Sequence, residues 1–315
     1  MHVTYLSDIH LELRKKLPKD ITKLFPENFG ANILVLAGDI GNPFSDLYKT
    51  FLELCVSRFL YVLVVSGNHE YYTSTKRQRT MEETDQQISR ICEATGAQHL
   101  TVGKAFDVPN DISDKNHDIT DNNYDSSDNN YDSGYRFVGC TLWSEVDRSA
   151  ENIMNDYSNI YLNFGVPGIV RQRRMEGVMG PRDFMRPKNL YVREGTKSLR
   201  YTDVLNLHNT HRDYIIQEIN KAREENKKVI IVTHHAPSYR MVLSDMSVDI
   251  SDHDKCYGTN LEHLFNDPVV AWISGHTHDS KNIAVNNIPS VSNCYGYPIQ
   301  KFTDTKFTFE TKLLL

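Results

Sequence analysis

The chain has 315 residues, of which 39% are hydrophobic and 24% charged, and its formal net charge is −6. This composition supports a sizeable core and excludes a wholly disordered or fibrous chain. The longest apolar run, 59–65, is far shorter than the roughly 20 residues of a membrane span, and the amino terminus lacks a basic n-region and an apolar h-region. The five cysteines are scattered without a C-x-x-C pair, which argues against a disulfide framework or a thiolate zinc site. We therefore expect a cytoplasmic protein with no membrane association.

The charge is unevenly distributed along the chain. Residues 107–134 hold eight Asp and one Lys and repeat the sequence Asp-Asn-Asn-Tyr-Asp-Ser. Such a segment cannot bury enough apolar surface to offset its ordering entropy, which predicts a disordered acidic insert. Residues 171–200 hold nine Lys or Arg against three acids, and we interpret 165–200 as a basic, cap-like insert. The remainder predicts a single domain that spans 1–315.

The predicted elements alternate between strands and helices. In chain order they are a strand at 3–6, a strand at 33–37, a helix at 44–57, a strand at 60–65, a helix at 76–94, a helix at 203–225, a strand at 229–232 and a strand at 269–273. Gly96 is expected as a C-cap and Thr202 as an N-cap. The tail 301–315 alternates like edge strands. This order is typical of α/β layering.

Polar residues that can bind metals come directly after the apolar strands. They are Asp8, His10, Asp39, Asn68, His69, His234, His276 and His278. Ligands bind beyond the carboxyl ends of strands in α/β sheets, so these side chains are expected to converge. Asp8/His10 and His276/His278 are i, i+2 pairs, which point the same way in extended backbone.

The donor types indicate a dinuclear site. Without His69 there are two Asp, one Asn and four His, whereas a mononuclear zinc site needs three or four protein ligands. Mixed nitrogen and oxygen donors suit Mn, Fe or Zn. Two metals roughly 3.5–4 Å apart are a known device for in-line attack at phosphorus.

Five sequence blocks carry a resemblance to a known family. They are Asp8-Ile9-His10, Gly38-Asp39-Ile40-Gly41-Asn42, Gly67-Asn68-His69-Glu70, Thr233-His234-His235-Ala236-Pro237 and Gly275-His276-Thr277-His278. In this order they resemble the calcineurin-like metallophosphoesterase superfamily. The runs Leu6-Ser7-Asp8-Ile9-His10-Leu11-Glu12, Cys140-Thr141-Leu142-Trp143, Met154-Asn155-Asp156-Tyr157 and Gly296-Tyr297-Pro298 are similar to a small bacterial-type phosphoesterase subfamily.

The resemblance implies a fold and a set of residue roles. The fold would be an α/β four-layer α-β-β-α sandwich with two mixed β-sheets and a dinuclear metal site at the strand C-terminal ends. Asp8, His10 and His278 would hold one metal, Asn68, His234 and His276 the other, and Asp39 would bridge both. A metal-bridging hydroxide would attack the phosphorus of a phosphomonoester or phosphodiester. His69 would assist the leaving group, and only the family analogy selects His234 over His235 as a ligand.

Two departures concern substrate contacts, and one is Ser274, which stands where the subfamily often has His before the Gly-His-x-His block. The subfamily often has Asn-Pro-Arg-Gly-Tyr where this chain has Asn293-Cys294-Tyr295-Gly296-Tyr297, so an Arg that would face phosphate is missing. As a hypothesis, cap residues meet the substrate phosphates instead. These are Arg171, Arg173, Arg174, Arg182 and Arg186.

The cofactors expected are two divalent ions, with Mn²⁺ first and Fe, Zn, Ni or Co as alternatives. A small phosphorylated substrate is the expected partner. A metal-dependent nuclease is one alternative function, supported by the basic segment alone; salt-sensitive DNA binding would favour it. A non-catalytic interaction scaffold is another, but such proteins lose ligand or catalytic His residues that are present here.

Other aromatic residues and histidines are interpreted as structural. Tyr71 and Tyr72 are interpreted as packing under the His69 turn. The histidines without a strand-end context are interpreted as structural, and His253 is one of them.

Overall fold

The computed structural model describes residues 1–18, 33–73, 78–109, 134–163, 193–243, 249–308 and 313–314. Most of the acidic insert and of the basic insert lies outside these ranges, including all five arginines of the cap hypothesis. The two insert predictions and the single-domain prediction therefore stay predictions.

Two larger mixed sheets make up the centre of the described chain. The first has the order β13-β1-β2-β3-β4, and all its neighbouring pairs are parallel except β13 with β1. Its strands are β1 (His2–Leu6), β2 (Ile33–Ala37), β3 (Tyr61–Val65), β4 (Gln98–His99) and β13 (Leu313–Leu314).

The second sheet has the order β11-β12-β10-β9-β6-β5, with β5 and β11 antiparallel at its edges. Its strands are β5 (Phe106–Val108), β6 (Tyr135–Cys140), β9 (Lys228–Thr233), β10 (Val269–Ser274), β11 (Asn282–Val285) and β12 (Ile288–Ser292). A separate hairpin-like pair joins β7 (Tyr161–Asn163) and β8 (Thr196–Ser198).

The two sheets pack face to face through alternate residues of their strands. On β2, Val35 lies in the core between the sheets, whereas its neighbours Leu34 and Leu36 lie in the core beneath the helices. Phe137 and Ile230 face Val35's core from the second sheet. Because both faces of the central strands are covered, these strands are continuous apolar runs, as buried parallel strands require.

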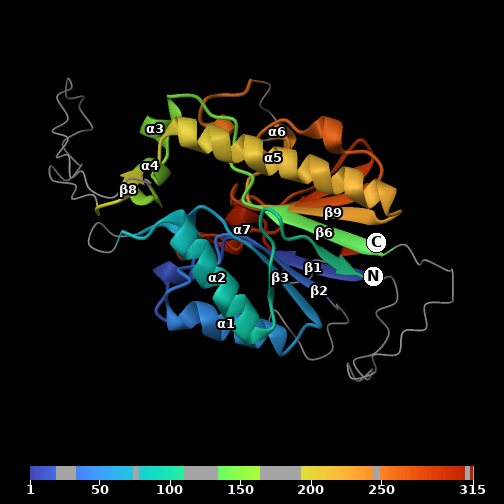
Figure 1. Cartoon of the computed structure of the whole chain (residues 1–315), viewed down its shortest axis with the longest axis horizontal. Coiled ribbons are helices and arrows are strands. Elements are labelled where there is room, and N and C mark those ends of the chain that lie inside the picture. Colours follow the sequence, from blue (N-terminus) through green and yellow to red (C-terminus); the bar gives the residue numbers. More distant parts are fainter. Residues whose placement is uncertain are drawn as a thin grey trace.

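Helices cover the outer face of each sheet, which gives four layers (Figure 1). α1 (Asp46–Val56) and α2 (Met81–Thr95) pack on the first sheet, and α5 (Tyr201–Glu224) packs on the second. The shorter helices are α3 (Ala150–Ile153), α4 (Asp156–Asn159), α6 (Tyr239–Val242) and α7 (Phe302–Thr305). The α-β-β-α sandwich expected from the resemblance is confirmed. Within the described residues, no helix combines the length and apolar character that a membrane crossing requires.

Most helix ends follow the sequence signals, but one does not. α2 begins with a capping box between Thr80 and Glu83 and ends at Gly96, which is left-handed as predicted (φ 89°). The predicted N-cap Thr202 is wrong, because it lies inside α5. Arg200 precedes the helix, and its backbone N–H donates to the Asp203 carboxylate at 3.0 Å, which starts the helix earlier.

The tail was expected to form edge strands, and this expectation is only partly correct. β13 pairs antiparallel with β1. Residues 302–305 instead form α7, where the backbone N–H of Lys301 donates to Asp304 at 3.0 Å. This local capping bond stabilises a helical turn in place of a strand.

Candidate metal centre

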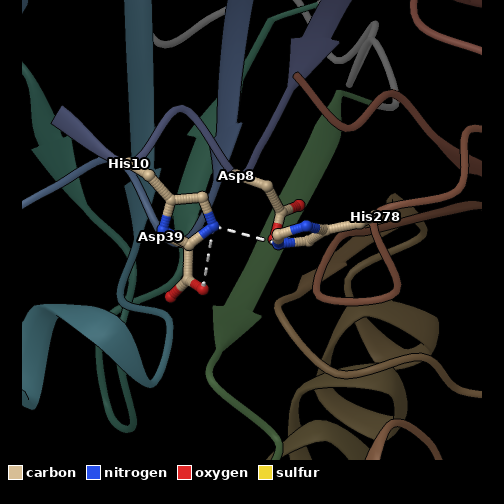
Figure 2. Close-up of side chains that lie close together, drawn as sticks. All are labelled: Asp8, His10, Asp39 and His278. Atoms are coloured by element: carbon tan, nitrogen blue, oxygen red, sulfur yellow. Dashed lines mark hydrogen bonds and ion pairs between the residues drawn. The ribbon is translucent and has the colours of Figure 1, made fainter. Parts of the chain in front are cut away.

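The predicted site residues lie in loops at the carboxyl ends of their strands. Asp8 and His10 follow β1, Asp39 follows β2, Asn68 and His69 follow β3, His234 follows β9, and His276 and His278 follow β10. Their ligand atoms gather in two adjoining groups that share Asp39, and His69 lies in a third with His10 and Glu12. Asp8, His10, Asp39 and His278 point toward one another in Figure 2.

The backbone of these loops is strained. Five of the residues have positive φ although none is glycine: Asp8 (57°), His10 (52°), Asp39 (54°), His276 (68°) and His278 (53°). Each such residue costs on the order of 1–3 kcal/mol, and such strain concentrates at functional sites. The expectation that the i, i+2 pairs lie in extended backbone is therefore wrong. The Asp8 and His10 N–H groups bond the carbonyls of Gly38 and Asp39 across the loops instead.

Gly67 is required because two loops approach closely there. A Cβ at this position would lie 2.5 Å from the backbone nitrogen of Asp39 and would also overlap the Asp39 carboxylate. A side chain at residue 67 would displace the residue that both metal groups share.

The first group holds two imidazoles and two carboxylates. The Nε2 atoms of His10 and His278 are 2.9 Å apart. The Nε2 of His10 is 3.8 Å from Asp39 Oδ2, and that of His278 is 3.3 Å from Asp8 Oδ1. Asp8 is fully buried; burial raises its pKa, but the hydrogen bond and charge of His278 outweigh this and lower it to about 2. Asp8 is therefore ionised at neutral pH.

Hydrogen bonds on the far side of each ring fix the tautomers of this group. His10 Nδ1 lies 2.9 Å from Glu12 Oε1, and a carboxylate only accepts, so Nδ1 carries the proton. His278 Nδ1 lies 2.9 Å from Gln300 Oε1, which also accepts the backbone N–H of Tyr297. In their neutral forms the two rings turn their Nε2 lone pairs toward each other, an arrangement that a bound cation would stabilise.

The second group collects acceptor atoms in the same way. His234 Nε2 lies 3.3 Å from Asp39 Oδ1 and 3.1 Å from Asn68 Oδ1. His234 Nδ1 donates to the carbonyl of Ala37 at 2.9 Å, and Asn68 Nδ2 donates to Asp156 at 2.9 Å. When His234 is neutral and Nδ1 carries its proton, the lone pairs of its Nε2, of Asn68 Oδ1 and of Asp39 converge on the centre.

His276 completes the second group. Its Nε2 is buried and has no hydrogen-bond partner among the described residues. A buried polar atom in this state costs free energy unless a ligand absent from the protein coordinates satisfies it. His276 lies with Asp39 and His234 in a group whose ligand atoms are all within 4.8 Å of one another.

His235 is oriented away from this group. Its Nδ1 lies 3.3 Å from the carbonyl of Thr141, and its fully buried ring packs at 4.1 Å, between centroids, from His276. Burial lowers the pKa of His235 well below its usual value. The structure therefore brings His234, and not His235, to Asp39.

Asp39 carries the negative charge common to both groups. Burial raises its pKa, but His234, His69 and His10 together lower it well below its usual value. Burial lowers the pKa of His234, but the charge and hydrogen bond of Asp39 raise it to about 9. The centre therefore attracts positive charge.

Glu70 holds the Asp39 loop in place. Its carboxylate accepts the backbone N–H groups of Asp39 (3.0 Å), Ile40 (2.7 Å), Gly41 (3.1 Å) and Gly67 (2.7 Å). Burial and the charge of Asp39 raise the pKa of Glu70 to about 8. This residue fixes the loops that follow β2 and β3 relative to each other.

His69 lies at the edge of the centre and is less buried than the other histidines of the two groups except His278. Its Nδ1 lies 3.0 Å from Glu12 Oε1, and its Nε2 lies 3.3 Å from the Tyr297 hydroxyl. Its ring stacks on Tyr72 at 4.2 Å, so Tyr72 does pack against this turn. Burial lowers the pKa of His69, but Asp39 and Glu12 raise it to about 9.

Sequence reasoning assigned no role to several residues that contact the predicted site residues. They are Glu12, Glu70, Asp156, Tyr297 and Gln300. All but Gln300 stand inside the sequence blocks that carry the family resemblance, which was the available signal. The blocks do not show which ring nitrogen or amide each of them contacts.

A cavity of about 430 Å³ opens over the centre. Its lining includes Asp39, His69, His276 and His278 together with Tyr72, Met154, His253, Tyr257 and Tyr297. His253, interpreted from sequence as structural, therefore lies at this cavity. The described basic residues near the end of the cap segment are paired elsewhere: Arg193 with Glu83, Lys197 with Asp203 and Arg200 with Glu151.

Comparison with known proteins identifies the class. A family model for calcineurin-like phosphoesterases matches residues 1–280. The chain belongs to the calcineurin-like phosphoesterase family. This confirms the resemblance drawn from the five sequence blocks, and it makes the chain a member of a family of hydrolases.

Individual proteins are similar to this chain over nearly its whole length. Uncharacterized protein L509 of Acanthamoeba polyphaga mimivirus is 27% identical, over 93% of this chain and 90% of that protein. The crystal structure of a phosphopantetheinyl hydrolase from Mycobacterium tuberculosis is similar in fold, with a TM-score of 0.56 and 15% identity over 99% of this chain and 95% of that chain. A dimetal phosphatase from Danio rerio matches with a TM-score of 0.43 and 14% identity, covering 93% and 86% of the two chains.

Proposed function

We propose that this chain hydrolyses a small phosphorylated substrate, a phosphomonoester or phosphodiester, with two divalent cations at the candidate metal centre. Asp8, His10 and His278 would hold one cation, Asn68, His234 and His276 the other, and Asp39 would contact both. Mn²⁺ is the ion we expect first, with Fe, Zn, Ni or Co as alternatives that similar donors accept.

One observation carries the proposal: side chains that can each offer a metal-ligand atom converge from two sides on Asp39. His234 Nε2, which also lies 3.1 Å from Asn68 Oδ1, faces one carboxylate oxygen of Asp39, and His10 Nε2 faces the other. The buried Nε2 of His276 has no partner among the described residues. Nitrogen and oxygen donors without thiolates suit these ions, so the residues present fit two cations.

The cations, when bound, would supply Lewis acidity and lower the pKa of water. The chain's own contribution on the leaving-group side is His69. Glu12 accepts from His69 Nδ1 and leaves Nε2 as the nitrogen that can give a proton to the leaving oxygen. The bond from phosphorus to that oxygen breaks, water supplies the new hydroxyl group, and the alcohol leaves with the proton from His69.

Hydrolysis of bis-p-nitrophenyl phosphate and p-nitrophenyl phosphate tests the proposal. Chelator-stripped protein reloaded with Mn²⁺ should cleave at least one ester, and Asp39→Asn should lose the activity and bind less Mn²⁺. Asp107→Asn is the matched control, since Asp107 is also ionised but lies in an unrelated ion-pair cluster. The diester/monoester ratio distinguishes the two substrate types. Failure of the wild-type protein to cleave either ester with any of the five metals would refute the proposal.

A further inference from the structure

A second depression shares His69 and Tyr297 with the cavity over the metal centre. Its volume is about 490 Å³, and its other lining residues are Leu13, Pro298 and Ile299. We call these three residues the apolar shelf. They come from two segments nearly 290 residues apart in sequence, the loop after β1 and the loop that follows β12.

The shelf holds the two most exposed large hydrophobic side chains of the described residues. Ile299 is 91% exposed and Leu13 is 54% exposed, whereas the other exposed large hydrophobics are between 36% and 42% exposed. Single exposed hydrophobics are ordinary on protein surfaces. Two such residues beside one reactive histidine form a patch, and such patches are typical of binding sites.

The contacts of His69 place the shelf on the side where a leaving group would lie. Leu13 directly follows Glu12, which binds His69 Nδ1. Pro298 and Ile299 directly follow Tyr297, whose hydroxyl lies 3.3 Å from His69 Nε2. The His69 ring is therefore held at Nδ1 by the segment that carries Leu13 and approached at Nε2 by the segment that carries Pro298 and Ile299.

We propose that the apolar shelf binds the leaving group, and that the substrates are phosphoesters of uncharged alcohols with an alkyl or aryl body. This inference rests on the proposed function, because it needs His69 as the acid. The released alcohol takes the His69 proton and departs over the shelf, while the phosphoryl group gains the hydroxyl from water.

The two charged residues that directly flank Leu13 in sequence, Glu12 and Arg14, make contacts within the protein. Glu12 is engaged by His10 and His69. Arg14 donates to the carbonyls of Ile9 (2.9 Å) and Gly296 (3.0 Å) and lies 4.9 Å from the centre of the Tyr295 ring. These two residues are occupied within the protein, so the shelf recognises its ligand through apolar contact.

The test compares two alcohols of similar acidity and different apolar size. The Mn²⁺-loaded protein is assayed with ethyl and octyl phosphate below the micelle concentration, or with their methyl diesters if diesters are preferred. The released alcohol is measured directly. Since burying one methylene changes affinity about fourfold, we expect kcat/KM to be at least about tenfold higher for the octyl ester.

Shelf variants connect this difference to the site. Ile299→Ser and Leu13→Ser should each lower kcat/KM for the octyl ester by about tenfold and lower that for the ethyl ester much less, so that the octyl/ethyl ratio falls. Both residues are exposed, so the fold should not depend on them. Leu60→Ser is the matched control, because Leu60 is an exposed leucine (38%) that directly precedes β3, away from the carboxyl ends.

A binding measurement separates the shelf from catalysis. Calorimetry with octylphosphonate and ethylphosphonate should give a preference for octyl that Ile299→Ser removes. An octyl/ethyl ratio near one, or a ratio that neither shelf variant changes, would overturn the inference. If Ile299→Ser changes only the oligomeric state, the shelf is a contact between copies and the inference is also wrong. Failure of the proposed function looks different, since the wild type would then cleave neither ethyl nor p-nitrophenyl esters.

Discussion

Two clusters of charged side chains lie at opposite ends of the strands of the second sheet. Near the amino ends of β6 and β9, Arg136 pairs with Asp107, Glu218 and Glu225, and Lys227 pairs with two of the same acids. At the carboxyl ends, the candidate metal centre gathers Asp39 with histidine and amide acceptors that face one another. In the first cluster each cation is paired with carboxylates. In the second, atoms that can bind a metal lie close to one another.

The comparison shows that a shifted pKa alone does not identify a functional site. The pKa of Asp107 is lowered to about 2 by the hydrogen bond and charge of Arg136. The pKa of Asp8 is also lowered to about 2, by His278 and against its burial. Asp8 differs from Asp107 in two ways. Its backbone is left-handed, and several other side chains that can bind a metal lie close to it. Such strain and such a cluster are stable only where a ligand or neighbouring structure compensates for them.

The largest effect should come from His69→Gln. Loss of the acid should lower kcat for an ester with an alkoxide leaving group by about 10²- to 10⁴-fold. An ester of p-nitrophenol, whose leaving group needs little protonation, should be affected by less than about tenfold. Steady-state kinetics on the two esters measure this difference. Equal losses for both would show that His69 does not act as the acid.

Glu12→Gln should have a smaller effect on activity. The carboxylate accepts from both His10 Nδ1 and His69 Nδ1. Gln keeps an acceptor oxygen but removes the negative charge, which weakens the hold on both rings. Residues in this kind of supporting contact typically contribute about 10- to 100-fold to activity or metal affinity. Kinetics and Mn²⁺ titration of the variant measure both quantities. An unchanged activity and an unchanged Mn²⁺ affinity would remove Glu12 from the site.

Arg136→Met should affect stability but not activity. Arg136 is 5% exposed, whereas its partners Asp107 and Glu225 are partly solvated. In the variant these two carboxylates remain paired with Lys227. We expect a loss of about 2 kcal/mol in the free energy of unfolding, between the values for exposed and buried pairs. Denaturant unfolding and kcat measure the two properties. A large fall in kcat of the folded variant would contradict the division between the two clusters.

The smallest effect concerns His99, a buried histidine that belongs to neither cluster. Its ring lies between the hydroxyls of Ser66 and Ser89, and burial lowers its pKa to about 4. Below pH 6.5 the unfolded chain protonates this residue while the folded chain does not, so stability falls as pH decreases toward 4. Between pH 7.5 and 5.5 the loss should be about 1 kcal/mol. His99→Gln should lack this share of the pH dependence in chemical denaturation, and equal slopes for both proteins would contradict it.

The fold could be predicted largely because its signals are local. The apolar runs that become β2, β3, β9 and β10 are continuous since both faces are buried, and Gly96 ends α2 as expected. The start of α5 was missed because the helix begins without the preferred Ser/Thr cap. The side chain of Asp203 accepts the backbone N–H of Arg200 instead. The tail was misjudged because Asp304 stabilises a short helix where alternation suggested a strand.

The site was predictable as a set of residues but not as a geometry. Strand-end position and family order identified the eight polar residues that the structure brings together. The left-handed backbone of Asp8 and His10 depends on bonds to the next loop, and no local pattern encodes it. The roles of Glu12 and Gln300 depend on which ring nitrogen each one faces, which is a property of the assembled fold.

The most direct test of the central claim is the metal content and magnetic coupling of the Mn²⁺-loaded protein. The account expects two Mn²⁺ per chain, with an electron paramagnetic resonance spectrum of two coupled ions, because Asp39 contacts both groups. Asp39→Asn should hold fewer ions and lose the coupling, while Asp107→Asn should keep both. A wild-type protein that binds no ion, one ion, or two uncoupled ions would contradict the account.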